Sequence, residues 1–143
     1  MKLDIQGVIK ALDAVGRSLA ENKDYLTELD SAIGDADHGI NMNRGFQKVH
    51  DRLTAGSYAD LGAVLKDVGM TLMGSVGGAS GPLYGTMFMK MSSRLAGREE
   101  LDTPSLAEAV EEGLKGIVAL GRANLQDKTM VDSLTPAVEA LKR

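Results

Sequence analysis

The feature that most constrains the fold of this chain is the spacing of its apolar residues, which recur at intervals of three and four along most of its length. This spacing places apolar side chains on one face of an α-helix. It predicts helices over about residues 3–21, 40–53, 57–72, 83–95, 103–121 and 130–141. No segment alternates between apolar and polar residues for long enough to indicate a strand. The sequence therefore predicts an all-α fold, with short connections and mostly antiparallel neighbours.

Capping and breaking residues predict where several of these helices begin and end. The Ser-Tyr-Ala-Asp segment at residues 57–60 resembles a capping box at the start of the third helix. Thr103 is expected to cap the fifth helix, with Pro104 at the first helical position, and Gly121 is expected to end it. Pro136 is expected to kink the last helix.

Length and composition exclude several classes of protein. A chain of 143 residues is expected to form one domain over residues 1–143. The absence of cysteine excludes a disulfide scaffold, a zinc finger and a thiolate nucleophile. A net charge of −4, with only three tyrosines, two phenylalanines and no tryptophan, argues against nucleic acid as a partner. The chain has no long apolar run and no signal peptide at its start, so we expect no membrane span and a cytoplasmic protein.

Three aspartates, Asp30, Asp35 and Asp37, fall within eight residues and have no lysine or arginine among them. Carboxylates brought together repel one another unless a cation compensates them, and oxygen ligands favour Mg²⁺ or Ca²⁺. An EF-hand is excluded, because counting from Asp35 places Phe46 where that motif needs a glutamate. The alternative interpretation is a solvated acidic turn that caps a helix, and the spacing alone leaves both open.

Glycines flank this acidic segment at positions 34 and 39, and the second helix is expected to begin directly after it. Free backbone N–H groups at a helix N-terminus then lie beside the carboxylates. A helix N-terminus next to a metal ion suits a phosphate that the metal bridges.

A second glycine-rich segment covers residues 74–86, where small residues allow the backbone to approach a ligand and Ser80 or Thr86 offers a hydroxyl. Known nucleotide fingerprints do not fit, because the chain has no G-x-G-x-x-G and Gly39 is followed by Ile-Asn instead of Lys-Ser/Thr. The alternative interpretation is a flexible loop, or small residues at a close helix contact. The two segments together favour an anion site made by two helix N-termini.

In their order along the chain, these segments resemble the L subunit of dihydroxyacetone kinase, the nucleotide-binding component of that system. The resemblance is carried by residues 29–45, 75–86, 121, 127–130 and 136–139, and it spans almost the whole chain. It implies an antiparallel α-helical barrel that holds a nucleotide at one end.

The resemblance also assigns functions to individual residues. It implies that Asp30, Asp35 and Asp37 bind two Mg²⁺ ions. It implies nucleotide contacts at eight further positions: the ADP phosphates at His38, Gly39, Ile40 and Asn41, the glycine-rich loop that closes over them at Ala79 and Ser80, and the adenosine at Gly121 and Met130. A methionine is a suitable neighbour for adenine, because its side chain is flexible and polarizable.

The resemblance implies a phosphoenolpyruvate-dependent phosphotransferase subunit that keeps ADP or ATP bound as a coenzyme. A phosphohistidine on the M subunit would rephosphorylate ADP, and the γ-phosphoryl group would pass to dihydroxyacetone on the K subunit. The short chain with its own Met1 favours this subunit form over the fused, ATP-dependent enzymes. Two alternatives stay open: a regulatory module that binds Mg-nucleotide without turnover, and the nucleotide domain of another kinase, such as a fatty acid kinase.

The chain also departs from the family pattern. The family continues beyond the position of Arg143 with further barrel helices, an arginine that contacts the phosphates and an Asp-Pro-Gly loop. We therefore expect a barrel shortened at its C-terminus, with self-association through the open side as one means of covering its core. Arg44 is expected either to reach a partner's phosphate or to pair with a nearby acid, and His50 is expected to be a solvated surface residue.

Overall fold

The computed structural model describes residues 1–143 and confirms the prediction of an all-α fold. Seven helices and two short strands follow one another along the chain. Their bounds are β1 (Lys2–Asp4), α1 (Ile5–Glu21), α2 (Lys23–Asp30), α3 (His38–Ala55), α4 (Leu61–Ser75), α5 (Ser80–Arg94), β2 (Glu100–Asp102), α6 (Thr103–Gly121) and α7 (Met130–Lys142).

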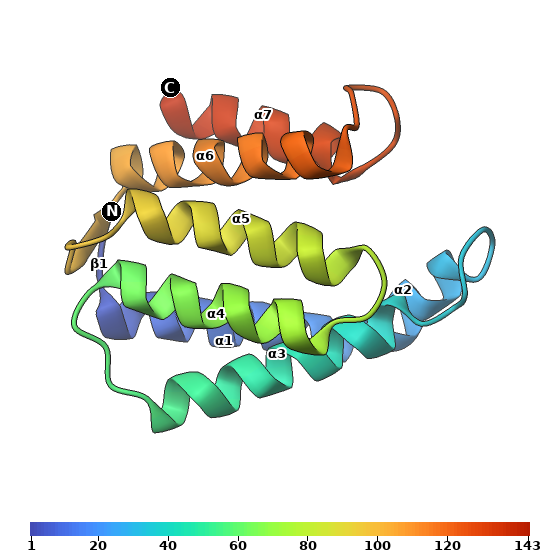
Figure 1. Ribbon diagram of the computed structural model, residues 1–143, viewed down its shortest axis with the longest axis horizontal. Coiled ribbons are helices and arrows are strands. Elements are labelled where there is room, and N and C mark those ends of the chain that lie inside the picture. Colours follow the sequence, from blue (N-terminus) through green and yellow to red (C-terminus); the bar gives the residue numbers. More distant parts are fainter.

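Helices α3 to α7 lie side by side in chain order, and α1 lies behind α4 and packs against α3 and α4 (Figure 1). Short connections make successive helices of this row antiparallel, as expected. Helix α7 packs extensively against α6 alone. Apolar side chains of α1, α4, α5 and α6, together with Met1 and the strands β1 and β2, line a pocket of about 190 Å³. This arrangement agrees with the expected helical bundle and its barrel-like, apolar interior.

Helix α4 is the centre of the hydrophobic core. Leu61, Val64, Val68 and Leu72 are at most 1% exposed and follow the helical spacing of three and four. Each apolar side chain buried in this way contributes about 1.5–3 kcal/mol. Because α4 is held by α3 on one side and α5 on the other, its C-terminal end is a fixed point from which the glycine-rich segment begins.

The expected capping box at the start of α4 is wrong. The helix begins at Leu61, and its N-cap is Asp60, whose carboxylate accepts hydrogen bonds from the backbone N–H groups of Ala63 at 2.7 Å and Gly97 at 2.8 Å. These bonds lower the pKa of the Asp60 carboxyl, because they stabilise its charged form. Asp60 is favoured over Ser57 as the N-cap, because its carboxylate accepts N–H groups from two separate segments.

The expected cap of α6 is also displaced by one residue. Asp102 is the N-cap, and its carboxylate accepts hydrogen bonds from the backbone N–H and the hydroxyl of Ser105. Thr103 is the first helical residue, while Gly121 ends the helix as predicted. The bonds from Ser105 lower the pKa of the Asp102 carboxyl.

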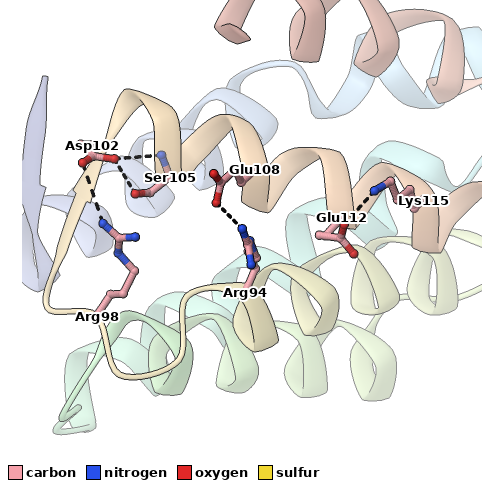
Figure 2. Close-up of polar contacts among 7 residues, drawn as sticks. All are labelled: Arg94, Arg98, Asp102, Ser105, Glu108, Glu112 and Lys115. Atoms are coloured by element: carbon pink, nitrogen blue, oxygen red, sulfur yellow. Dashed lines mark hydrogen bonds and ion pairs between the residues drawn. The ribbon is translucent and has the colours of Figure 1, made fainter.

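Polar contacts on the surface join the end of α5 to the start of α6. Figure 2 shows Arg94 paired with Glu108, and Arg98 reaching Asp102 at 3.8 Å. These pairs are half exposed, so each contributes little to stability. Both pairs span the turn between the two helices.

Three elements have no counterpart among the helices predicted from the sequence. Strands β1 and β2 form a three-residue antiparallel pair in which Leu3 lies opposite Leu101, and three residues are too few for an alternating pattern to be visible. Helix α2 is a separate helix that buries no side chain, and its apolar residues Tyr25, Leu26 and Leu29 span too short a stretch to predict a helix. No helix combines the length and the apolar character that crossing a bilayer requires.

Candidate metal and phosphate site

Three loops lie at one end of the helical row (Figure 1). They are the acidic loop at residues 31–37, the glycine-rich loop at residues 76–79, and the α6–α7 loop at residues 122–129. The residues that the sequence singles out are all in these loops or in the helix turns that adjoin them.

The structure brings the three aspartates of the acidic segment together. One carboxylate oxygen from each of Asp30, Asp35 and Asp37 lies within 4.8 Å of the others. None of these aspartates takes part in an ion pair with a lysine, arginine or histidine. Three uncompensated carboxylates at this separation repel one another, and a divalent cation among them removes that repulsion. The oxygen-only ligand set fits Mg²⁺ or Ca²⁺.

Local backbone geometry creates this cluster. Asp30 ends α2, and its carboxylate accepts hydrogen bonds from the backbone N–H groups of Asp37 at 3.1 Å and His38 at 3.3 Å. Asp30 therefore folds the acidic loop back onto α2 and also caps α3. Gly34 is required there, because a Cβ added to it would lie 2.0 Å from the Asp30 carboxylate. Ala36 adopts a left-handed conformation, with φ of 58°, and this turn directs Asp35 and Asp37 to the same side.

The interpretation of the acidic segment as a simple helix cap therefore explains only Asp30, whose carboxylate caps α3. Asp37 occupies the N-cap position of α3 and makes no capping hydrogen bond through its side chain. Asp35 is exposed on the loop. Two carboxylates are thus left to a ligand, as the metal interpretation requires.

Two helix N-termini meet beside the aspartates. His38 is the first residue of α3 and Ser80 the first of α5, and the Ser80 hydroxyl lies 3.3 Å from His38 Nδ1. The N-cap residues Asp37 and Ala79 make no side-chain capping bonds, so, apart from the His38 N–H that Asp30 accepts, backbone N–H groups in the first turns of both helices stay free. Free N–H groups and the positive ends of two helix dipoles together suit a phosphate.

The remaining phosphate-loop candidates lie in the first turn of α3. Gly39 packs so closely against α2 that an added Cβ would lie 1.9 Å from the carbonyl oxygen of Lys23. Ile40 is 48% exposed, and Asn41 is only 8% exposed. The structure therefore leaves Ile40 open to solvent next to the cluster, and fixes Gly39 and Asn41 in tightly packed positions.

Gly121 and Met130 lie at the two ends of the α6–α7 loop. Gly121 ends α6 beside α5, where a Cβ added to it would lie 3.2 Å from Leu83 Cδ2, one turn from Ser80. Met130 is half-buried and begins α7. The structure places both residues at the end of the molecule that holds the acidic loop.

Two residues near the site have functions that the sequence analysis missed. The Arg44 guanidinium makes no ion pair with an acid. It donates hydrogen bonds to Asn41 Oδ1 and to the Ser75 carbonyl oxygen. The Asp132 carboxylate accepts from the backbone N–H groups of Gln126 at 2.6 Å and Lys128 at 2.9 Å, both in left-handed conformations. The spacing of one helical turn between Asn41 and Arg44 could have indicated their contact. The contact of Arg44 with the Ser75 carbonyl oxygen has no signal in the sequence.

The DAK2 domain model matches residues 32–143. The ADP-binding subunit DhaL of the PEP-dependent dihydroxyacetone kinase of Escherichia coli is 43% identical over 143 residues, which are 100% of this chain and 68% of the relative. The corresponding subunit DhaL of kinase 1 of Listeria innocua is 44% identical over 99% of this chain and 71% of its own length. The chain therefore belongs to the DAK2 domain family.

The fold agrees with this assignment. The crystal structure of the dihydroxyacetone kinase from C. freundii in complex with AMP-PNP and Mg²⁺ matches with a TM-score of 0.84 and 25% identity. That match covers 99% of this chain and 26% of the crystallised chain. The chain thus spans about two thirds of the two bacterial subunits and about a quarter of the crystallised kinase.

Proposed function

We propose that this chain is the nucleotide-binding subunit of a phosphoenolpyruvate-dependent dihydroxyacetone phosphotransferase, with residues 1–143 acting as one nucleotide-binding domain. In this proposal ADP stays bound as a coenzyme. It receives a phosphoryl group from the phosphohistidine of a carrier, the M subunit, and the resulting ATP passes that group to dihydroxyacetone on the K subunit. The names of the relatives, ADP-binding subunits of dihydroxyacetone kinases, support this activity.

The observation that carries the proposal is the pairing of an uncompensated aspartate cluster with two helix N-termini whose N-cap residues make no side-chain capping bond. Asp30, Asp35 and Asp37 would hold two Mg²⁺ ions, which when bound neutralise charge on phosphate oxygens. The first turn of α3, residues 38–41, would donate backbone N–H groups and the Asn41 amide to those oxygens. Ala79 and Ser80 would close over them from α5, and Gly121 and Met130 would flank the adenosine.

None of these groups is a nucleophile. The aspartates would act through the metal ions, and the backbone amides and other side chains would bind and orient the phosphates. Phosphoryl transfer depends mainly on positioning and on electrostatic stabilisation. A protein that forms no covalent intermediate can therefore support it. The donor and the acceptor must reach the phosphates from outside. The exposed position of Asp35 at the tip of the acidic loop supports access from that side.

Native mass spectrometry of the purified protein tests the nucleotide assignment directly. In the presence of Mg²⁺ we expect a species heavier by one ADP and two Mg²⁺, either as purified or after addition of Mg-ADP. A protein that remains bare after addition of Mg-ADP would contradict the proposal.

Replacement of one ligand tests the metal assignment. Asp35→Asn removes one charge from the cluster and keeps the shape of the side chain. We expect Mg-ADP affinity, measured by calorimetry, to fall by at least about tenfold, the scale of one lost charged contact. Asp24→Asn is the matched control, because Asp24 lies on neighbouring α2 and its side chain is 97% exposed. Equal affinities of the two variants would show that Asp35 binds no metal.

A regulatory module that binds Mg-nucleotide without turnover is the alternative within the same site. A coupled assay with the K and M subunits and phosphoenolpyruvate separates the two functions. Dihydroxyacetone phosphate formed only when this chain is added supports the subunit, and Mg-ADP binding without product supports the module.

We also propose that the chain associates with a second copy of itself. A groove of about 520 Å³ between α6 and α7 is lined by four apolar side chains, Leu114, Val118, Ala119 and Val138, and by five polar or charged ones, and a second copy of the chain is its proposed occupant. Sedimentation equilibrium over a wide range of concentration tests this, and a monomer throughout would exclude it.

A further inference from the structure

Arg44 connects two segments of the site that are far apart in the sequence. From α3, its Nη2 donates to Asn41 Oδ1 at 2.7 Å, one turn earlier on the same helix. Its Nε donates to the carbonyl oxygen of Ser75 at 3.3 Å, at the last residue of α4. One side chain thus joins the first turns of α3 to the start of the glycine-rich loop.

The contact around Arg44 extends over three consecutive residues, 75–77. Next to Ser75, Val76 packs against Gly45 so closely that a Cβ added to this glycine would lie 2.4 Å from Val76 Cγ2. A Cβ added to Gly77 would lie 3.1 Å from Asn41 Nδ2. The first half of the glycine-rich loop is therefore seated on α3.

Arg44 also determines which way the Asn41 amide faces. A guanidinium group has only donors, so the atom of Asn41 that faces it is the amide oxygen. The amide nitrogen then faces the glycine-rich loop near Gly77. Because Asn41 is only 8% exposed, water has little access to stabilise the reverse orientation. Phosphate oxygens are acceptors, so this orientation presents to them the donor side of the amide.

We propose that Arg44 is a positioning residue of the nucleotide site, which acts by orienting the Asn41 amide and seating the glycine-rich loop. The proposal rests on the proposed function, since it assumes that phosphates bind between α3 and this loop. Without Arg44 the amide is free to turn its oxygen toward the phosphates, and residues 75–77 lose a contact with α3. We expect Arg44→Ala to weaken Mg-ADP binding by about tenfold, the effect of one charged hydrogen bond.

A double-mutant cycle distinguishes positioning from a direct contact. Mg-ADP affinity is measured by calorimetry for the original protein, Arg44→Ala, Asn41→Ala and the double variant. If Arg44 acts mainly through Asn41, its removal from the Asn41→Ala protein lowers affinity by much less than the roughly tenfold loss in the original protein, and the remaining loss reflects the contact with Ser75. Arg44→Lys is expected to recover part of the loss, because an ammonium still donates to the amide oxygen. Losses that multiply fully in the double variant would overturn the proposed orienting of Asn41, and an unchanged affinity of Arg44→Ala would overturn the whole proposal.

Arg52→Ala is the matched control. Arg52 lies on the same helix, is also exposed, and donates two hydrogen bonds to Asp67 away from the glycine-rich loop. We expect it to leave Mg-ADP affinity unchanged. A loss equal to that of Arg44→Ala would show that the effect comes from general destabilisation of α3 and would overturn the proposal.

A second measurement needs no nucleotide. Hydrogen exchange followed by mass spectrometry on the nucleotide-free protein reports how firmly residues 75–80 are held. We expect severalfold faster exchange there in Arg44→Ala and no change in Arg52→Ala. Equal exchange in Arg44→Ala and the original protein would overturn the seating of the loop. If the original protein binds no Mg-ADP, the proposed function fails, and the exchange experiment alone still decides whether Arg44 holds the loop.

Discussion

Gly39 shows how a single missing side chain allows the acidic loop to form. The added Cβ of Gly39→Ala would lie 1.9 Å from the Lys23 carbonyl oxygen and 2.7 Å from the Thr27 hydroxyl. Helices α2 and α3 must then move apart, and overpacking of this kind costs about 1–3 kcal/mol. We expect urea unfolding to show a loss of that size, accompanied by weaker Mg²⁺ binding, because the move displaces Asp30 at the end of α2.

Gly74→Ala is the control for this substitution. Gly74 lies in the last turn of α4 with open space around the position of an added Cβ. Alanine is the better helix former there, so the variant is expected to be as stable as the original protein or up to about 1 kcal/mol more stable. A Gly39→Ala protein that behaves like Gly74→Ala would contradict the close approach of α2 and α3.

His50 gives a pH-dependent contact between α1 and α3. Its Nδ1 lies 2.9 Å from Asp13 Oδ1, and this hydrogen bond and the charge of Asp13 raise the pKa of His50 above 6.5. A raised pKa in the folded state means that the pair stabilises the fold below pH 6.5 and loses its effect as the pH rises through the folded-state pKa. The exposed position predicted for His50 is confirmed, although it has a partner.

The comparison of the original protein with His50→Gln isolates this contribution. The difference in free energy of unfolding between the two proteins is measured at about pH 5.5 and at about pH 8.5, on either side of the ordinary histidine pKa. We expect the original protein to be favoured at the lower pH and the difference to shrink at the higher pH. A difference that is constant, or that grows with pH, would show that the contact does not depend on the charge of His50.

At the scale of the elements, α3 and α5 differ from the other helices of the row in how they are capped. Helices α1, α4 and α6 begin with Asp4, Asp60 and Asp102, and each of these carboxylates accepts a backbone N–H of its own helix. Helices α3 and α5 begin at the opposite end, and their N-cap residues make no side-chain capping bond, whereas the Thr129 hydroxyl caps α7 at that same end. Because N–H groups without a cap need another acceptor, the first turns of α3 and α5 are the part of this end that suits an anion.

The same elements show how far the sequence alone could predict the fold and the site. The core helices were predictable because their buried side chains repeat at three and four, whereas α2 buries none and was missed. The aspartate cluster was predictable because its three members are close in sequence. The contacts of Ser80 with His38 and of Arg44 with Ser75 join residues 42 and 31 positions apart. Such contacts depend on how α3, α4 and α5 pack, which local patterns do not encode.

At the scale of the whole molecule, the helices differ in how many neighbours hold them. Helix α4 packs against α1, α3 and α5, whereas α7 packs extensively only against α6 and buries just Val131 and Val138. Local opening requires less free energy where fewer apolar contacts must be broken. The site therefore combines loops held by the central helices with one loop, at residues 122–129, that leads into the least supported helix.

This difference predicts two classes of amide in native-state hydrogen exchange. Amides of α4 are expected to exchange only through global unfolding, with a steep dependence on urea, and amides of α7 through a smaller opening with a shallow dependence. Val138→Ala should speed exchange severalfold in α7 and leave α4 nearly unchanged, whereas Val68→Ala should speed exchange in both. Identical urea dependence for α4 and α7 would mean that the helical row unfolds as one unit, and that α7 supports the α6–α7 loop as firmly as α4 supports the glycine-rich loop.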